Sequence, residues 1–245
     1  MIVEIKVYRC PKCNSVDIIK NGHDYKGAQK FHCKACGAYG TLLKKSMAAQ
    51  TKRRQVIDAY CERVSMRGIE RIFGVSRYYL ARWLLETVAK LPPLSATLVK
   101  REPGDVLELD ELWSFVLKKS QKRWVWLALC RRTRQIVAYV IGDRSEETCR
   151  KLWERIPAEY KACHTFSDFW EAYQKVFPDD SHQSVGKESG QTAHVERWIN
   201  TLRQRLARFV RKTLSFSKSD RFHEAALKLF IYRHNLSCAH AISQF

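Results

Sequence analysis

The chain has 245 residues, of which 45% are hydrophobic and 28% are charged, and this composition excludes an intrinsically disordered protein. Glu4 and Lys6 interrupt the first eight residues, so we expect no signal peptide there. No apolar run reaches the about 18 residues that a membrane span needs, and we therefore expect a cytoplasmic protein with no membrane segment.

The net charge of +19 is concentrated at the two ends of the chain. Residues 1–100 hold 19 Lys and Arg against 7 acidic residues, residues 101–200 hold 16 of each kind, and residues 201–245 hold 9 against 2. Positive charge gathered in segments is typical of a protein that binds a polyanion. A solvated basic surface is the alternative, but the sequence pI of 9.7 favours nucleic acid as the partner.

Two cysteine pairs lie near the start of the chain. Cys10 and Cys13 form one C-x2-C pair, and Cys33 and Cys36 form a second pair after nineteen intervening residues. Four thiolates in this pattern predict a structural Zn²⁺ site in a zinc ribbon over residues 1–48, with a hairpin turn signal at Asn21-Gly22. Disulfides and a redox pair are less favoured alternatives, because nothing indicates secretion and two pairs are present.

The remaining cysteines are scattered, and four sulfurs already complete the zinc site without His23 or His32. We interpret five thiols as ordinary buried side chains: Cys61, Cys130, Cys149, Cys163 and Cys238.

Residues 49–91 predict a domain of three helices. The first is expected over residues 51–64 with Thr51 as a possible N-cap, and the second over residues 65–73, ended by Gly74. Ser76 can cap the third helix, which has apolar residues at core spacing: Tyr79, Leu80, Trp83, Leu84 and Val88.

A short helix, a glycine turn and a longer helix resemble a helix-turn-helix. The start of its second helix would then offer Arg77, Tyr78 and Arg82 to the major groove of DNA. A plain three-helix bundle with a solvated basic face is the alternative. Prolines at positions 92, 93 and 103 predict a linker over residues 92–104.

Residues 105–245 predict an α/β domain with a mixed sheet. Three strands, a helix, a strand, a helix, a strand and a helix is the order of the ribonuclease-H-like fold, an analogy that gives no function by itself. The expected strands cover residues 105–117, 123–132, 135–144, 163–168 and 181–186, and the expected helices cover residues 145–156, 169–177 and 192–212. The whole chain is therefore expected to be a multidomain α+β protein.

Three carboxylates in this domain are candidates for catalysis. Asp110 lies in the first strand, Asp168 at the end of the fourth, and Glu196 early on the last helix, so the three can converge at one edge of the sheet. Converging carboxylates can hold two Mg²⁺ or Mn²⁺ ions about 3.5–4 Å apart, as attack on a phosphodiester requires. Asn200 and Arg203 share the helix face of Glu196 and would approach the DNA backbone.

Simpler interpretations of these acids stay open from the residues alone. Glu196 could be a solvated surface acid, and Asp168 could be the N-cap of a helix that begins at Phe169. Three further acids lie close by in the sequence and are not excluded: Glu108, Glu111 and Glu171.

The segments "LELDELW", "TFSDFWEAY" and "HVERWINTLRQRLARFVRKTLSFSKS" resemble the catalytic part of the insertion-sequence-one (InsAB-type) family of bacterial transposases. The resemblance extends over nearly the whole chain, since a zinc ribbon and a helix-turn-helix precede a DDE catalytic domain in that family. It implies that Asp110, Asp168 and Glu196 are the catalytic triad, with Arg203 at the basic position seven residues after the glutamate. We also expect Lys218 to contact DNA.

The resemblance implies a transposase that binds the terminal inverted repeats of an insertion sequence. It would cut the DNA strand by attack of water and join the freed 3′ hydroxyl to target DNA, as a homodimer or larger assembly at the prokaryotic nucleoid. A repressor with an inactive carboxyl-terminal domain is one alternative, and a metal-dependent nuclease without strand joining is another.

Overall fold

The structure is a computed structural model that describes residues 7–25, 27–41 and 45–244, with the side chains of residues 45–48 left aside. Residues 1–6, where we expect no signal peptide, lie outside the described residues. The chain forms two compact units, Met1–Gln55 and Val56–Phe245. Both helices and strands are present, as a mixed α+β protein requires. None of the described helices is long and apolar enough to cross a membrane.

The first unit contains a small antiparallel sheet of β1 (Ile18–His23), β2 (Gln29–Cys33) and β3 (Tyr39–Thr41). The expected turn at Asn21-Gly22 is wrong: both residues lie within β1, where Gly22 takes a φ of 62° and the pairing with β2 shifts register. A positive φ suits glycine in a β-bulge as well as in a turn. The chain reverses after His23 instead. There the N–H of Asp24 donates to the carbonyl of Ala28, and the N–H of Ala28 donates to Asp24 Oδ1.

Helix α1 (Lys45–Cys61) crosses from the first unit into the second. It begins six residues before Thr51, which therefore is not its N-cap, because Ala49 and Gln50 favour a helix and nothing interrupts it. The expected boundary between residues 48 and 49 thus falls inside α1.

Helices α2 (Met66–Phe73) and α3 (Arg77–Ala89) follow with the expected ends. Ser65 Oγ accepts the N–H of Gly68 and Ser76 Oγ accepts the N–H of Tyr79, so each serine caps a helix. Gly74 ends α2 with a φ of 62°. Leu80 and Leu84 are buried as expected, but Tyr79 is 51% exposed and is not a core residue.

Residues 92–104, expected to be a linker, are packed against the rest of the second unit. They include the 3-10 helix η1 (Leu94–Thr97). The Gln135 side chain accepts the N–H of Val99 at 2.8 Å and donates to the carbonyl of Thr97 at 2.7 Å. The hydroxyl of Tyr232 donates to the carbonyl of Pro93 at 2.7 Å. Buried hydrogen bonds of this kind hold the segment in one path.

A five-stranded sheet forms the centre of the second unit, in the order β6-β5-β4-β7-β8. Strand β5 pairs with β4 and with β6 in antiparallel, whereas β7 pairs with β4 and with β8 in parallel. Their bounds are β4 Val106–Phe115, β5 Lys122–Cys130, β6 Ile136–Gly142, β7 His164–Ser167 and β8 His182–Ser184.

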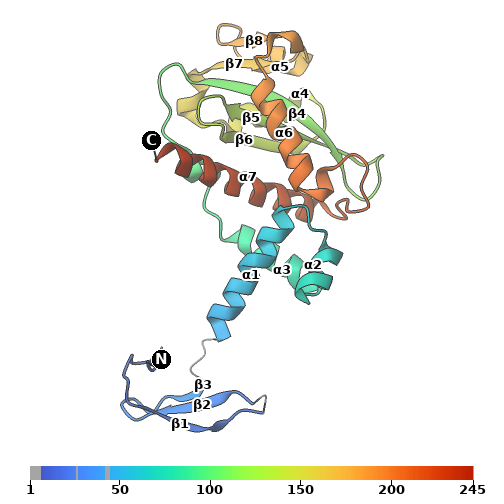
Figure 1. Cartoon of the computed structure of the whole chain (residues 1–245). Coiled ribbons are helices and arrows are strands. Elements are labelled where there is room, and N and C mark those ends of the chain that lie inside the picture. The colour runs from blue at the N-terminus through green and yellow to red at the C-terminus, as the bar shows by residue number, and fades with distance from the viewer. Residues whose placement is uncertain (1–6, 26, 42–44, 245) are drawn as a thin grey trace, which may run out of the picture. The chain divides into compact units, whose positions relative to one another are not determined.

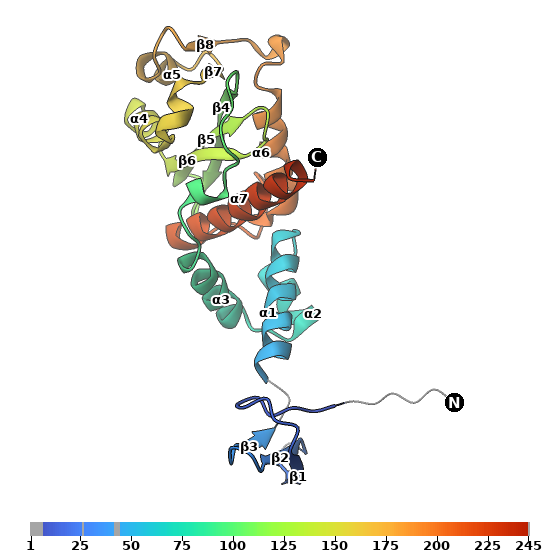
Figure 2. The ribbon, with the colours of Figure 1, turned by 90° about the vertical axis from the view of Figure 1, so that its left-hand side faces the viewer.

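Helices cover both faces of this sheet (Figures 1 and 2). Their bounds are α4 Glu146–Arg155, α5 Glu171–Val176, α6 Ala193–Arg205 and α7 Asp220–Ile242, with 3-10 helices η2 Ala158–Ala162, η3 Lys187–Ser189 and η4 Ala207–Phe209. Leu107 and Leu109 of β4 pack in the cluster of α4 and α5, while Leu112 packs in the cluster of α6 and α7. Alternate residues of β4 therefore face opposite layers.

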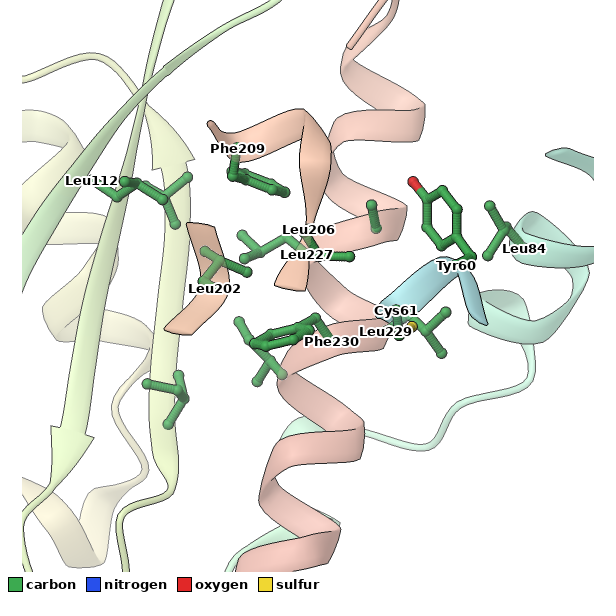
Figure 3. Packing of buried hydrophobic residues seen from close by; sticks show 14 of the residues in the cluster. Tyr60, Cys61, Leu84, Leu112, Leu202, Leu206, Phe209, Leu227, Leu229 and Phe230 are labelled. Carbon is green, nitrogen blue, oxygen red and sulfur yellow. The ribbon is translucent and has the colours of Figure 1, made fainter. Parts of the chain in front are cut away.

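Helix α7 joins the sheet to helices α1–α3. Leu227 and Phe230 of α7 share one hydrophobic cluster with Leu202 on the sheet side and with Tyr60 and Leu84 on the side of α1 and α3 (Figure 3). Within the second unit, the three-helix segment and the sheet thus have a common core.

The end of the predicted helix over residues 192–212 is wrong, because α6 ends at Arg205. Leu206 adopts an extended conformation, and the backbone N–H of Arg63 donates to the carbonyl of Arg205 at 2.7 Å. Leu206 and Phe209 are buried all the same, so the apolar stripe was identified correctly and the local conformation was not. Tertiary contacts here override helix propensity. Helix α7 was not predicted.

Candidate functional site

Asp110 lies on the face of β4 that packs against α6. It is half-buried, and its Oδ1 accepts the N–H of Glu111 at 2.7 Å. Burial, together with the charges of Glu111, Asp168 and Glu196, raises the pKa of Asp110 to about 7. All three neighbouring acids are thus close enough to affect its ionisation.

Asp168 follows directly after β7 and lies beside Asp110. The parallel register pairs Val106 with His164 and Glu108 with Phe166. Continued by two residues, this register places Asp168 next to Asp110, at about the 4.8 Å spacing of neighbouring strands. Helix α5 begins at Glu171, later than expected, so Asp168 is not its N-cap. Its Oδ1 instead accepts the N–H of Trp170 at 3.1 Å.

Glu196 lies in the first turn of α6, and the start of that helix is attached to β4. Glu108 Oε2 accepts the backbone N–H groups of His194 and Val195 at 2.9 and 3.1 Å. Glu108 precedes Asp110 by two residues, and His194 precedes Glu196 by two, so this contact brings Glu196 toward Asp110. Glu196 Oε1 accepts the hydroxyl of Thr192 at 3.1 Å.

The other acids of this region form ion pairs with basic side chains. Glu108 is fully buried, and its Oε1 accepts from Arg131 Nε at 2.7 Å and contacts His194 Nδ1 at 2.6 Å. Glu111 faces the opposite side of β4, where Arg144 Nε and the hydroxyl of Tyr173 donate to it at 2.6 and 3.0 Å. The exposed Glu171 pairs with Lys175 at 3.5 Å.

Asp110, Asp168 and Glu196 differ from these acids, since none of the three forms an ion pair with another described residue. Among the described residues, only the four cysteines have ligand atoms that all lie within 4.8 Å of one another. The oxygens of the three acids are therefore spread more widely than that. Asp168 and Glu196 raise the pKa of Asp110, so a nearby cation would favour the charged form of that acid. Hard oxygen donors of this kind fit Mg²⁺ or Mn²⁺.

Arg203 of α6 is influenced by both an acid of this group and a cation. Burial and the charge of Arg211 lower its pKa, while the charge of Asp110 raises it. Asn200 is exposed on the same helix, and Lys218 is exposed in the segment before α7. A phosphate near Asp110 would therefore meet a positive charge on α6.

The four predicted zinc ligands come together in the first unit. Their Sγ atoms lie within 4.8 Å of one another, with Cys10 and Cys36 separated by 3.6 Å and Cys13 and Cys33 also by 3.6 Å. A tetrahedral Zn²⁺ with Zn–S bonds of about 2.3 Å needs sulfurs about 3.8 Å apart, so the set fits this ion. Backbone N–H groups of Cys13 and Lys12 lower the pKa of Cys10 to about 6, which favours a thiolate.

Of the other five thiols, four are buried as expected. Cys238 is only half-buried and lies 3.5 Å from His234 Nε2.

The candidate recognition residues lie at the start of α3. Tyr78 is 71% exposed, and Arg77 and Arg82 carry exposed guanidinium groups that pair with Glu70 and Glu86 at 3.4 and 2.8 Å. Both pairs are exposed and contribute little stability, so a phosphate could replace either acid. Sequence reasoning missed the roles of Arg131, His194 and Arg144, because each lies far from its partner acid along the chain.

Comparison with known proteins gives consistent matches to the strand-rich part of the chain. The family model described as IS1 transposase matches residues 106–237. The insertion element iso-IS1n protein InsB of Shigella dysenteriae is 39% identical over 129 residues, which cover 53% of this chain and 95% of that protein. The insertion element IS1 4 protein InsB of Escherichia coli (strain K12) is 34% identical over 141 residues, which cover 56% of this chain and 82% of that protein.

Proposed function

Because the chain belongs to the IS1 transposase family, we propose that it binds the terminal inverted repeats of an insertion sequence, cleaves DNA there and transfers the freed strand to target DNA. The observation that carries this proposal is the convergence of three acids without ion-pair partners among the described residues, Asp110, Asp168 and Glu196. Asp110 lies in β4, Asp168 follows β7, and Glu196 lies in the first turn of α6.

In this proposal Asp110, Asp168 and Glu196 hold two Mg²⁺ or Mn²⁺ ions, which activate the nucleophile and stabilise the leaving oxygen when bound. Arg203, whose charge already acts on Asp110, binds the phosphate next to the scissile bond, and Asn200 and Lys218 bind the backbone on either side. Glu108 holds the start of α6 so that Glu196 faces Asp110.

The architecture supports a ribonuclease-H-like assignment for residues 105–245. The sheet order β6-β5-β4-β7-β8, antiparallel through β4 and parallel beyond it, agrees with that expectation, as does the alternation of helices and strands after β6. This likeness raises the expectation of phosphodiester chemistry but does not establish it.

The amino-terminal parts are proposed to bind the DNA ends. Residues 1–48 would form a zinc ribbon held by Cys10, Cys13, Cys33 and Cys36, and residues 49–91 a helix-turn-helix that offers Arg77, Tyr78 and Arg82. The family model begins at residue 106, so this assignment depends on the caps, the exposed residues and the charge. Two element ends must be held together, and a homodimer or larger assembly follows from that requirement.

A repressor with an inactive carboxyl-terminal domain would need only the first 100 residues. It would gain nothing from an acid whose pKa is raised by burial and by three neighbouring acids, since that arrangement lowers the stability of the fold at neutral pH. A nuclease without strand joining shares the acids, and it is the alternative that an activity assay must distinguish.

The test begins with an end sequence, selected by the zinc-loaded chain from a pool of random DNA duplexes. The unaltered chain should cleave this duplex with Mg²⁺ and should join a precut duplex with a 3′ hydroxyl to plasmid DNA. Glu196→Gln should bind the duplex normally and lose cleavage and joining by orders of magnitude, because the ions lose one ligand.

Glu171→Gln is the matched control, because Glu171 is an exposed acid paired on its own helix, and it should retain both activities. Normal cleavage by Glu196→Gln would show that the triad is wrong. Cleavage without joining by the unaltered chain would favour the nuclease, and binding without either reaction would favour the repressor.

A further inference from the structure

Two basic segments that are far apart in the sequence form one surface in the second unit. The hairpin between β4 and β5 and the segment before α7 lie side by side (Figure 1). Val116 pairs with Ser217, and Leu117 N–H donates to the carbonyl of Ser217 at 2.8 Å. The rings of Phe115 and Phe216 pack with centroids 5.6 Å apart. Backbone and ring contacts therefore fix the hairpin, residues 116–122, against the loop, residues 210–218.

This surface is strongly positive. Neither segment contains an acidic residue. Its six exposed cations are Lys118, Lys119, Lys122, Arg211, Lys212 and Lys218. In the part of the chain that the structure describes, these six form no ion pair. The nearby Asp220 is paired with Arg123 instead, at 2.6 Å. Cations that neutralise no acid of their own are available for a polyanion.

Two leucines project from the same surface. Leu214 is 98% exposed in the middle of the loop, and Leu117 is 53% exposed at the tip of the hairpin with a φ of 63°. A leucine with positive φ is a strained conformation that core packing does not explain here. Apolar side chains flanked by cations are typical of proteins that place a wedge in a DNA groove.

The surface is aligned with the proposed reaction site. Strand β4 carries Asp110 and leads directly into the hairpin at Val116. Along β4, the distance from Asp110 to Val116 is about 20 Å at the rise of an extended strand. A duplex with 3.4 Å per base pair would cover this distance in about six base pairs.

We propose that residues 116–122 and 210–218 form a DNA-binding surface that holds the duplex about six base pairs from the scissile phosphate, with Leu214 against base edges in a groove. The proposal rests on the proposed function, since it takes the duplex at Asp110 as its starting point. It adds a contact region of the catalytic part that is separate from the acids and from α3.

The first test measures how the affinity of the full zinc-loaded chain for a 30-base-pair random duplex depends on salt. The variant with Lys118→Gln, Lys119→Gln, Arg211→Gln and Lys212→Gln should reduce the slope of log K against log salt by about 2 to 4, because each lost phosphate contact removes about 0.9. The control carries Arg150→Gln and Lys151→Gln on α4, where both cations are exposed. It should keep the slope of the unaltered chain.

The second test places the photocrosslinker p-benzoylphenylalanine at position 214, or at position 236, where the leucine on α7 is 54% exposed. Position 214 should crosslink to bases of the end duplex about six base pairs from the cleavage site, and position 236 should not. An unchanged salt slope together with no crosslink at 214 overturns the surface. If the unaltered chain still cleaves in that case, the proposed function stands; if the surface binds and nothing is cleaved, the proposed function fails instead.

Discussion

At the scale of single residues, the fate of each acid on β4 is decided by what faces it. Glu108 and Glu111 meet arginines, a histidine and a tyrosine, whereas Asp110 meets two further acids. Among the described residues, Glu108 and Glu111 thus form ion pairs, whereas Asp110 forms none. Glu111 points to the layer opposite Asp110, whereas Glu108 shares the face of Asp110 and is paired there with Arg131 and His194.

Asp110→Asn should stabilise the chain at neutral pH when Mg²⁺ is absent. The folded pKa of about 7 lies above the ordinary value of 3.8, so the unaltered fold loses stability as the pH rises from about 4 to 7 and stays at the lower level above that. Asparagine does not ionise, so the variant does not lose this stability as the pH rises. We expect thermal unfolding at pH 8 to show a Tm higher by roughly 5 to 10 °C for the variant, and at pH 4 little difference. A lower Tm for Asp110→Asn at pH 8 would contradict the crowding of the acids.

Glu108→Gln should destabilise the start of α6. Both oxygens of Glu108 accept from donors on α6 and from Arg131, and an amide NH₂ in place of either oxygen would face a donor. We expect a loss of about 2–3 kcal/mol in the free energy of unfolding by urea, and a higher Mg²⁺ concentration for half-maximal cleavage. Glu171→Gln should change neither quantity, and equal behaviour of the two variants would remove the positioning role of Glu108.

At the scale of elements, some helix ends are set by a capping residue beside them in the sequence, and others are set by contacts with distant residues. Ser65, Gly74 and Ser76 set the ends of α2 and α3 as expected from sequence, because each acts within one turn of the helix that it ends. The end of α6 at Arg205 depends instead on Arg63, which lies far away in the sequence. The small sheet of the first unit presents a third case, in which four sulfurs gather around one point.

Cys33→Ala should remove zinc from the chain and unfold the sheet of β1, β2 and β3. A three-stranded sheet of this size buries too little apolar surface to fold without its metal. Metal analysis should give one zinc per unaltered chain and none for the variant, with weaker DNA binding. Cys238→Ala, which removes a thiol outside the cluster, should keep one zinc, and a full zinc content in Cys33→Ala would rule out this ligand set.

At the scale of the whole molecule, one cluster of side chains connects the helices expected to bind DNA with the sheet that carries the acids. Phe230 of α7 is buried in this cluster (Figure 3). Its ring lies 5.8 Å from the ring of Trp198 and 5.2 Å from the guanidinium carbon of Arg205. The packed residues 92–104 add hydrogen bonds across the same region. Residues 56–245 should therefore unfold together rather than as separate domains.

Phe230→Ala should lower the stability of this entire unit. Loss of a buried phenylalanine costs about 3–5 kcal/mol, which lowers Tm by roughly 10 °C in a unit of this size. Calorimetry should show one shifted transition for residues 56–245. Leu236→Ala on the same helix should shift it by less than about 1 °C, because that side chain is exposed. Two transitions that move independently would show that the common core does not couple the parts.

The sequence by itself determined the features that depend on local spacing. These are the C-x2-C pairs, the serine and glycine ends of α2 and α3, and the order of strands and helices from residue 105 to α6. Tertiary structure decided which acids are neutralised, where α6 ends, that α7 joins two regions in one core, and that residues 116–122 meet residues 210–218. Each of these depends on a partner about 20 to 140 residues away, and the periodicity of one segment carries no information about which distant side chain will face it.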